Sequence, residues 1–420
     1  MKIIIIGPAH PYRGGIALFS NRLADALVSD GNAVNIITFK LQYPSFLFPG
    51  KTQFSENENT SKVNTLRAVN SINPFNWIKV GMQIRAAQPD LVIFKYWMPF
   101  MAPCFGTIAK FIKKDPAIKI ISLVHNLVPH EKRAGDKLLT NYFVQQMDGF
   151  IAMSQSVIDD IYKFNTSKPK VLSPHPLYDN FGKIKTRKEA LKALNLDDQY
   201  NYMLFFGIVR KYKGLDILLK AFADKRLNNG QLKLIVAGEF YEEDTEYINL
   251  LKQHNLMDAI IMTKSFVPDD EVANYFCAAD IVVQPYKTAT QSGVTQIAYH
   301  FNKPMIVTDV GGLKELCPHN KVGFVVNVNP IEIADAILKF HEEGHHDKMV
   351  ENILNEKKKY SWEILTNNIY TLVRIKRKFV RVTHNKRKPN HGKSNRNIKS
   401  QRRSRKNNLR IKCRSRIKFA

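Results

Sequence analysis

Residues 205–214 read FFGIVRKYKG, and they join an apolar, strand-like run to a helix-like run at residues 215–219. A glycine at the end of a buried strand, here Gly207, lets the backbone approach a ligand closely. In open α/β sheets, ligands bind at such junctions, outside the carboxyl ends of the strands. The segment therefore predicts an α/β fold with a ligand-binding site at the end of this strand.

Two cations, Arg210 and Lys213, stand where the helix-like run begins. A guanidinium fork and a point charge near a helix N-terminus suit a diphosphate group. The alternative is a pair of solvated cations on a first helical turn, where they would oppose the positive end of the helix dipole. Because that placement is electrostatically poor, we interpret Arg210 and Lys213 as phosphate-binding, catalytic residues.

A second junction follows the apolar strand at 281–285 and precedes another helix-like run. Successive amides at 292–294 would point at an anion, and the hydroxyls of Thr290 and Ser292 would add donors. An ordinary N-cap is an equally good explanation of the segment taken alone, but its order after Arg210 and Lys213 favours binding. The candidate binding residues are Thr290, Gln291, Ser292, Gly293 and Val294.

A third junction, TDVGG at residues 308–312, closes the set. It could line the base of a bound nucleotide, although a structural turn is the favoured interpretation of Asp309. Near the N-terminus, Gly14 and Gly15 follow the first apolar run and form a candidate phosphate-facing turn. A glycine pair is weak evidence alone, because many strand-to-helix turns use one.

His125 directly follows an apolar strand at 120–124 and faces the same sheet edge. A histidine there could hydrogen-bond a sugar hydroxyl or move a proton, and a structural cap is the alternative. His130 and Glu131, in the loop that follows, could help to bind an acceptor or orient His125.

Working outward, apolar runs alternate with helix-like runs along the whole body of the chain, which predicts two doubly wound parallel sheets. Two Rossmann-like domains facing one another across a cleft fit this pattern. The predicted strands lie at 3–7, 34–39, 91–94, 120–124, 150–153, 203–207, 232–237, 259–262, 281–284, 305–308 and 323–326.

A length of 420 residues favours two domains. We predict an N-terminal Rossmann-like domain at 1–178, a C-terminal Rossmann-like domain at 179–373 and a disordered basic tail at 374–420. The tail holds 20 Lys and Arg residues and no Asp or Glu, which removes 20 of the 26 net positive charges and leaves +6 for the body. So basic and apolar-poor a segment cannot offset its ordering entropy.

The four cysteines show no metal-ligand spacing, so we expect a reducing cytoplasm and no metal site. No signal peptide or membrane-spanning helix is predicted. The tail could bind nucleic acid or anionic lipid headgroups, or be a solvated extension or a reading-frame artefact. Its shortage of aromatic residues argues against stacking on single strands.

The combination of FFGIVRKYKGLDILLKAF, AADIVVQPYKTATQSGV and KPMIVTDVGGLKE, read in that order, resembles the GT-B glycosyltransferases. The chain is similar to their retaining, family-4-like group, typical of bacterial polysaccharide assembly, over residues 1–373. PYRGGIALFSNRLADAL and VHNLVPHE, nearer the N-terminus, agree with it. The resemblance implies transfer of a sugar from a nucleoside-diphosphate donor, without metal or cofactor and with retained anomeric configuration. It also implies that residues 1–178 form the acceptor domain and residues 179–373 the donor-nucleotide domain.

Residue by residue, the resemblance implies that Arg210 and Lys213 bind the donor diphosphate and that residues 292–294 bind phosphate and sugar through their amides. Gly15 matches the glycine-rich turn near the diphosphate, and His125 the cleft histidine beside the transferred sugar. Fixed cations and amides would stabilise the charge that builds on the departing diphosphate.

One departure concerns two glutamates that many relatives carry before the Lys303-Pro304 step. Counting back from Pro304, those places hold Ala289 and Ile297, and Gln291 or Gln296 would have to substitute.

We therefore predict a cytoplasmic glycosyltransferase that acts on a saccharide or lipid-linked acceptor, and we expect the acceptor to be presented at the inner membrane face. Two alternatives stay open: a sugar-nucleotide epimerase or hydrolase of GT-B shape, and a nucleic-acid- or membrane-binding protein with a vestigial sugar site.

Overall fold

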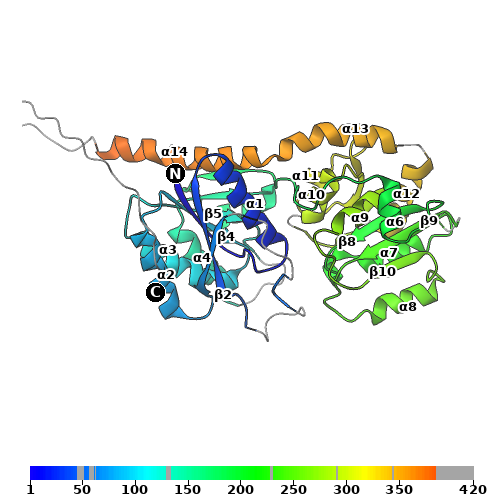
Figure 1. Ribbon diagram of the computed structural model, residues 1–420, viewed down its shortest axis with the longest axis horizontal. Coiled ribbons are helices and arrows are strands. Elements are labelled where there is room, and N and C mark those ends of the chain that lie inside the picture. The colour runs from blue at the N-terminus through cyan, green and yellow to red at the C-terminus, as the bar shows by residue number, and fades with distance from the viewer. Residues whose placement is uncertain are drawn as a thin grey trace, which may run out of the picture. The chain divides into compact units, whose positions relative to one another are not determined.

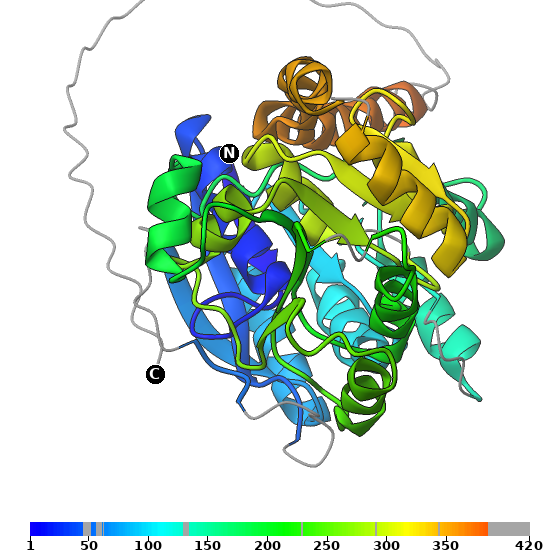
Figure 2. The same cartoon turned by 90° about the vertical axis from the view of Figure 1, so that its right-hand side faces the viewer.

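The computed structural model describes residues 1–44, 52–55, 61, 63–128, 134–227, 230–289, 292–342 and 345–384. Met1–Lys376 form one compact unit, and it contains two parallel sheets with helices around them (Figures 1 and 2). We call β1–β7 with α1–α5 the N-terminal lobe, and β8–β13 with α6–α12 the C-terminal lobe.

In the N-terminal lobe, the described residues form a seven-stranded sheet in the order β3-β2-β1-β4-β5-β6-β7. The isoleucines of its first strand are buried, as expected for a parallel strand covered by helices on both faces. The strands are β1 (Lys2–Ile6), β2 (Ala33–Leu41), β3 (Asn64–Asn70), β4 (Leu91–Tyr96), β5 (Lys119–Val124), β6 (Gly149–Ala152) and β7 (Lys170–Leu172). The helices are α1 (Gly15–Ser29), α2 (Pro74–Ala86), α3 (Ala102–Ile112), α4 (Asp136–Gln146) and α5 (Gln155–Phe164).

In the C-terminal lobe, six described strands follow the order β10-β9-β8-β11-β12-β13. They are β8 (Asn201–Phe206), β9 (Leu232–Ala237), β10 (Ile260–Thr263), β11 (Ile281–Gln284), β12 (Met305–Thr308) and β13 (Gly323–Val326). The helices are α6 (Arg187–Ala193), α7 (Leu215–Phe222), α8 (Thr245–Gln253), α9 (Val272–Ala278), α10 (Gly293–His300), α11 (Leu313–Leu316) and α12 (Pro330–Glu342). The predicted α/β fold with two Rossmann-like halves is confirmed.

Two strands were missed by the sequence prediction, β3 and β7. β3 is the edge strand of its sheet, and most of its residues are partly or fully exposed, so it lacks the apolar run that marked the other strands. β7 is three residues long, too short to show a period. Both lie at the sheet edges, where burial on two faces does not constrain the sequence.

After α13 (His346–Glu356), the chain enters α14 (Trp362–His384), which runs along the N-terminal lobe (Figure 1). The indole Nε1 of Trp362 donates to the carbonyl of Leu177 at 3.0 Å, and the hydroxyl of Tyr370 donates to Asp30 at 2.8 Å. α14 therefore follows the C-terminal lobe in sequence but packs on the N-terminal one. The predicted start of the tail at residue 374 falls inside this helix.

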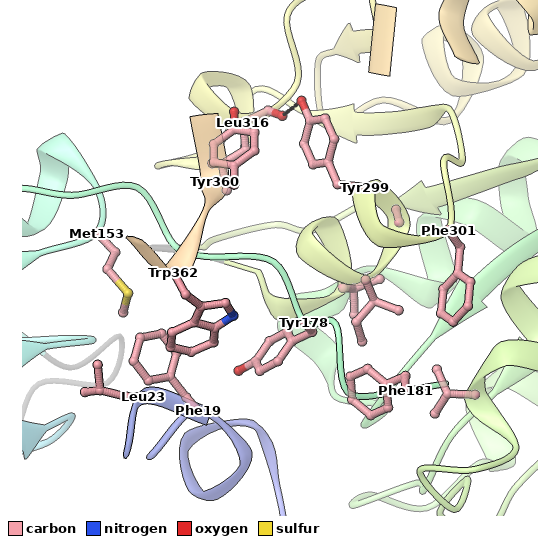
Figure 3. Close-up of a cluster of buried hydrophobic side chains, with 14 of the residues drawn as sticks. Phe19, Leu23, Met153, Tyr178, Phe181, Tyr299, Phe301, Leu316, Tyr360 and Trp362 are labelled. Atoms are coloured by element: carbon pink, nitrogen blue, oxygen red, sulfur yellow. Dashed lines mark hydrogen bonds between the residues drawn. The ribbon is translucent and has the colours of Figure 1, made fainter. Parts of the chain in front are cut away.

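An apolar cluster joins the two lobes next to this crossing (Figure 3). Phe19 of α1 packs edge-on against Trp362 with ring centroids 5.0 Å apart, and Tyr178 packs against Phe181 at 5.8 Å. Part of the segment that connects the lobes is thus anchored in core, because Tyr178 and Phe181 are buried, whereas residues 182–186 are exposed.

Within the part of the chain that is described, no helix is both long and apolar enough to cross a bilayer. Residues 385–420, which make up most of the basic tail, lie outside the described residues. The predicted acceptor-loop pair His130 and Glu131 and the binding residues Thr290 and Gln291 lie outside them as well.

Candidate functional site

A cavity of about 710 Å³ is lined by residues from both lobes. It lies among the loops that follow the carboxyl ends of β1, β5, β8 and β11, which is where open α/β sheets bind ligands. Every described residue among the predicted site residues lines it: Gly14, Gly15, His125, Gly207, Arg210, Lys213, Ser292, Gly293 and Val294. The third predicted junction does not line the cavity. Its Asp309 forms an exposed ion pair with Lys314 at 2.9 Å instead.

Gly207 is where the two predicted phosphate-binding segments meet. Its φ is +97°, and a side-chain carbon built there would lie 3.3 Å from Nζ of Lys213 and 3.6 Å from Cγ2 of Val294. A substituted residue would be strained by this backbone and would crowd both neighbours. The glycine therefore lets the cation segment and the amide segment approach each other.

The two predicted cations are held by aromatic rings rather than by acids. The guanidinium of Arg210 lies 5.2 Å from the ring centroid of Tyr241, and Nζ of Lys213 lies 5.3 Å from that of Tyr286. Neither cation forms an ion pair with a described residue. Burial, with a smaller contribution from Arg210, lowers the pKa of Lys213. Both cations are therefore available to an anionic ligand.

Ser292 occupies the N-cap position of α10, but its side chain does not cap the helix. Its hydroxyl donates to Oε1 of the buried Gln284 at 2.6 Å, and the hydroxyl of Thr295 donates to the same oxygen at 3.1 Å. The Ser292 hydroxyl thus donates to Gln284 rather than into the cavity, and its predicted role as a ligand donor stays a prediction. The amides at the start of α10 keep no side-chain cap, which leaves them for an anion.

Tyr178, in the segment between the lobes, joins the two glycine turns. Its hydroxyl donates to the carbonyl of Gly15 at 2.9 Å, and a side-chain carbon built at Gly293 would lie 3.0 Å from its ring. The sequence analysis assigned no role to this tyrosine. The neighbouring apolar and aromatic residues, Leu177 and Phe181, were the available signal.

His125 lines the cavity from the N-terminal lobe, and its ring packs edge-on against Phe19 with ring centroids 5.2 Å apart. Burial, then the neighbouring Lys95 and His175, lower its pKa well below the ordinary range. His175 behaves in the same way: burial lowers its pKa to about 4, and its Nδ1 lies 2.7 Å from the carbonyl of Pro176. Both imidazoles are thus neutral at neutral pH.

Lys95, on β4, is the unexpected member of this group. It is fully buried, its Nζ makes no hydrogen bond with a described residue, and it lies 3.3 Å from the ring centroid of Phe19. Burial lowers its pKa far below the usual lysine value. The apolar run around it, LVIFKY, gave no sign that the lysine points into the core beside two histidines.

The positions of the two absent glutamates are apolar in three dimensions as well. Ala289 and Ile297 are buried, and Ile297 lines the cavity. Gln296, one suggested substitute, is buried and is not among the lining residues, so it does not reach a ligand there. Among the described residues there is also no group of three or more His, Cys, Asp or Glu that could hold a metal ion.

Two family profiles match the chain. The one described as "Glycosyl transferases group 1" matches residues 186–359, and "Glycosyltransferase Family 4" matches residues 13–174. Between them they cover most of both lobes.

Individual proteins agree with the profiles. The uncharacterized glycosyltransferase MJ1607 of Methanocaldococcus jannaschii is 26% identical over 412 residues, which cover 89% of this chain and 98% of that protein. The fold is similar to that of sucrose-phosphate synthase from Thermosynechococcus elongatus, with a TM-score of 0.70, 17% identity and coverage of 89% and 98%. It is also similar to Anabaena Alr3699/HepE in complex with UDP, with a TM-score of 0.68, 16% identity and coverage of 89% and 99%. The chain therefore belongs to the GT-B glycosyltransferases, as an enzyme with a group 1 domain preceded by a family 4 domain.

Proposed function

We propose that the chain transfers a sugar from a nucleoside-diphosphate donor to a saccharide or lipid-linked acceptor, with retention of configuration at the anomeric carbon and with its own cations in place of a metal. The observation that best supports this is the meeting of Arg210, Lys213 and the uncapped start of α10 around Gly207 in one cavity. The complex of Alr3699/HepE with UDP supports a uridine donor as the first to test.

The proposed chemistry follows from where these groups lie. The bond between the anomeric carbon and the diphosphate oxygen breaks, the acceptor oxygen bonds to that carbon, and the acceptor proton passes to the departing diphosphate. Arg210, Lys213 and the α10 amides stabilise the negative charge that builds on the leaving group, because they are fixed before it forms. His125, held neutral beside Lys95, hydrogen-bonds the transferred sugar without adding positive charge to an electron-poor anomeric carbon.

The acceptor end of the cavity is lined by Trp97 and Tyr43 of the N-terminal lobe. The indole Nε1 of Trp97 donates to the hydroxyl of Tyr43 at 2.7 Å, which fixes both rings. A rigid aromatic face of this kind supports the apolar face of a sugar ring.

The test is a thermal-shift panel of UDP, GDP, ADP and CDP, followed by product analysis with the matching nucleotide sugar. We expect one diphosphate to raise the melting temperature above the others, and labelled sugar to appear on a saccharide acceptor. No stabilisation by any diphosphate would contradict the proposal. Release of free or epimerised sugar at the same rate with and without acceptors would support the hydrolase or epimerase instead. Nucleic-acid or membrane contact through the basic tail stays a prediction.

A further inference from the structure

Arg13, in the loop between β1 and α1, makes its side-chain contacts with the opposite lobe. Its Nη2 lies 2.7 Å from Oε2 of Glu239, which follows β9 of the C-terminal lobe. The two side chains are only 12% and 7% exposed. Both line the cavity, so this shielded ion pair spans the two walls of the candidate site.

Two aromatic residues of the C-terminal lobe complete the surroundings of Arg13. Its guanidinium lies 4.9 Å from the ring centroid of Phe266, and it hydrogen-bonds the side chain of Tyr241. Tyr241 is the same residue whose ring lies 5.2 Å from the guanidinium of Arg210. An arginine from each lobe is thus brought to one tyrosine inside one cavity.

The charge balance of the lining residues leaves an unmatched cation. Among the described residues, the charged side chains that line the cavity are Arg13, Arg210, Lys213, Glu239 and Asp269. Burial, followed by the nearby Asp270, raises the pKa of Asp269. Arginine offers five N–H donors in a planar fork, and Glu239 and Tyr241 do not use all of them. The guanidinium can therefore hold Glu239 and bind an oxyanion at the same time.

We propose that Arg13 is a third cation of the diphosphate site, supplied by the N-terminal lobe and held in place by Glu239. This inference rests on the proposed function, since it assigns Arg13 to the same donor. It goes beyond the predicted role of the Gly14 and Gly15 turn, because it gives the neighbouring arginine side chain a direct contact with the leaving group. It also makes donor binding depend on both lobes, because Arg13 reaches the phosphates only from the opposite wall.

The competing explanation is that Arg13 and Glu239 only tie the lobes together. A charge reversal separates the two. Arg13→Glu with Glu239→Arg restores the ion pair between the lobes but puts a carboxylate where the diphosphate would lie. If Arg13 only links the lobes, the reversed pair recovers donor affinity. If Arg13 binds the diphosphate, affinity stays low.

The experiment measures binding affinity by calorimetry. One ligand is UDP, or whichever diphosphate stabilises the wild type most, and the other is the corresponding nucleoside, measured separately. We expect Arg13→Met to weaken diphosphate binding by about 10- to 100-fold, the loss of one or two charge-assisted hydrogen bonds, and to leave nucleoside binding unchanged. Arg13→Lys keeps the charge without the planar fork, so its diphosphate affinity should lie between those of the wild type and Arg13→Met. It replaces Arg13→Met in the test if the methionine variant does not fold. Glu239→Gln should give a smaller loss, because it frees the guanidinium without removing it.

The matched control is Arg22→Met. Arg22 also pairs with a carboxylate at 2.7 Å, that of Asp179, but it does not line the cavity. The Arg22→Met variant should bind the diphosphate as the wild type does. Wild-type affinity in Arg13→Met and Arg13→Lys, or full recovery in the reversed pair, would overturn the inference while leaving the proposed function intact. Failure of the wild type to bind any diphosphate would overturn both.

Discussion

The hydroxyl of Tyr178, a residue of the segment that joins the two lobes, donates to the backbone carbonyl of Gly15 at 2.9 Å. The same ring lies against Gly293 at the start of α10, so one side chain sets the distance between two turns that contribute amides to the cavity. Figure 3 shows Tyr178 among the packed aromatic residues that link the lobes, with Phe19 and Trp362 to one side and Phe181 to the other. The position of each turn therefore depends on a contact far from it in sequence.

Tyr178→Phe removes this hydrogen bond without removing the ring. We expect a loss of about 1 kcal/mol in unfolding free energy and a several-fold rise in the donor KM, because the Gly15 turn is no longer held. Tyr299→Phe is the matched control, since its hydroxyl also donates to a carbonyl, that of Leu316 at 2.7 Å, outside the cavity. It should lose similar stability with an unchanged donor KM. Equal KM values in the two variants would show that Tyr178 has no role in positioning the turn.

Gly214→Ala should disrupt the cation segment. Gly214 has a φ of +69°, and an added side-chain carbon would lie 1.9 Å from the carbonyl oxygen of Pro285. Gly31→Ala is the comparison, with a φ of +79° and open space around it. Strain alone should cost Gly31→Ala about 1–2 kcal/mol, and the steric clash should cost Gly214→Ala clearly more. Denaturant unfolding measures both, and equal losses would contradict the backbone placement next to Lys213.

Lys95→Met should stabilise the protein at neutral pH by about 2 kcal/mol, because it removes a buried amine that makes no hydrogen bond. The folded pKa of Lys95 lies far below its unfolded value, so the unfolded state binds more protons between these two values. Wild-type stability therefore rises with pH through that window and levels off near the unfolded pKa, about 10.4. The variant lacks this rise, so its advantage should shrink as the pH approaches 10. Parallel stability curves from pH 6 to 10 would be the opposite result.

Trp97→Ala should affect the acceptor and not the donor. Removing the aromatic face that lines the proposed acceptor end of the cavity should raise the KM for a saccharide acceptor by about 10-fold, within the range expected for a single aromatic contact. The donor KM, obtained in the same assays, serves as the internal control and should stay at its wild-type value. A rise in the donor KM alone would place the indole at the wrong end of the cavity.

The sequence was sufficient to predict residues that line the cavity where those residues lie close together along the chain. FFGIVRKYKG places a glycine, two cations and a strand-to-helix junction within ten residues, and Gly207, Arg210 and Lys213 do line the cavity. The same holds for Ser292, Gly293 and Val294, whose place in the cavity follows from the strand before them. Their roles in binding stay predictions until the variants are measured.

What the sequence did not show depends on contacts between distant segments. Arg13 and Glu239 are separated by 226 positions, and neither has a partner nearby in sequence that would reveal the pair. Lys95 looks like any lysine in a strand until the fold places it against the Phe19 ring and near His125. The hydrogen bond from the Ser292 hydroxyl to Gln284 was missed for the same reason, because Gln284 reaches it from β11.

The central claim is that paired cations at the end of β8 bind the donor diphosphate, and calorimetry of the Arg210→Met/Lys213→Met double variant tests it most directly. The control is Lys211→Met, an exposed cation of the same segment that does not line the cavity. We predict that the double variant keeps its melting temperature and binds the diphosphate at least about 100-fold more weakly, while Lys211→Met binds as the wild type does. Wild-type affinity in a folded double variant would contradict the account.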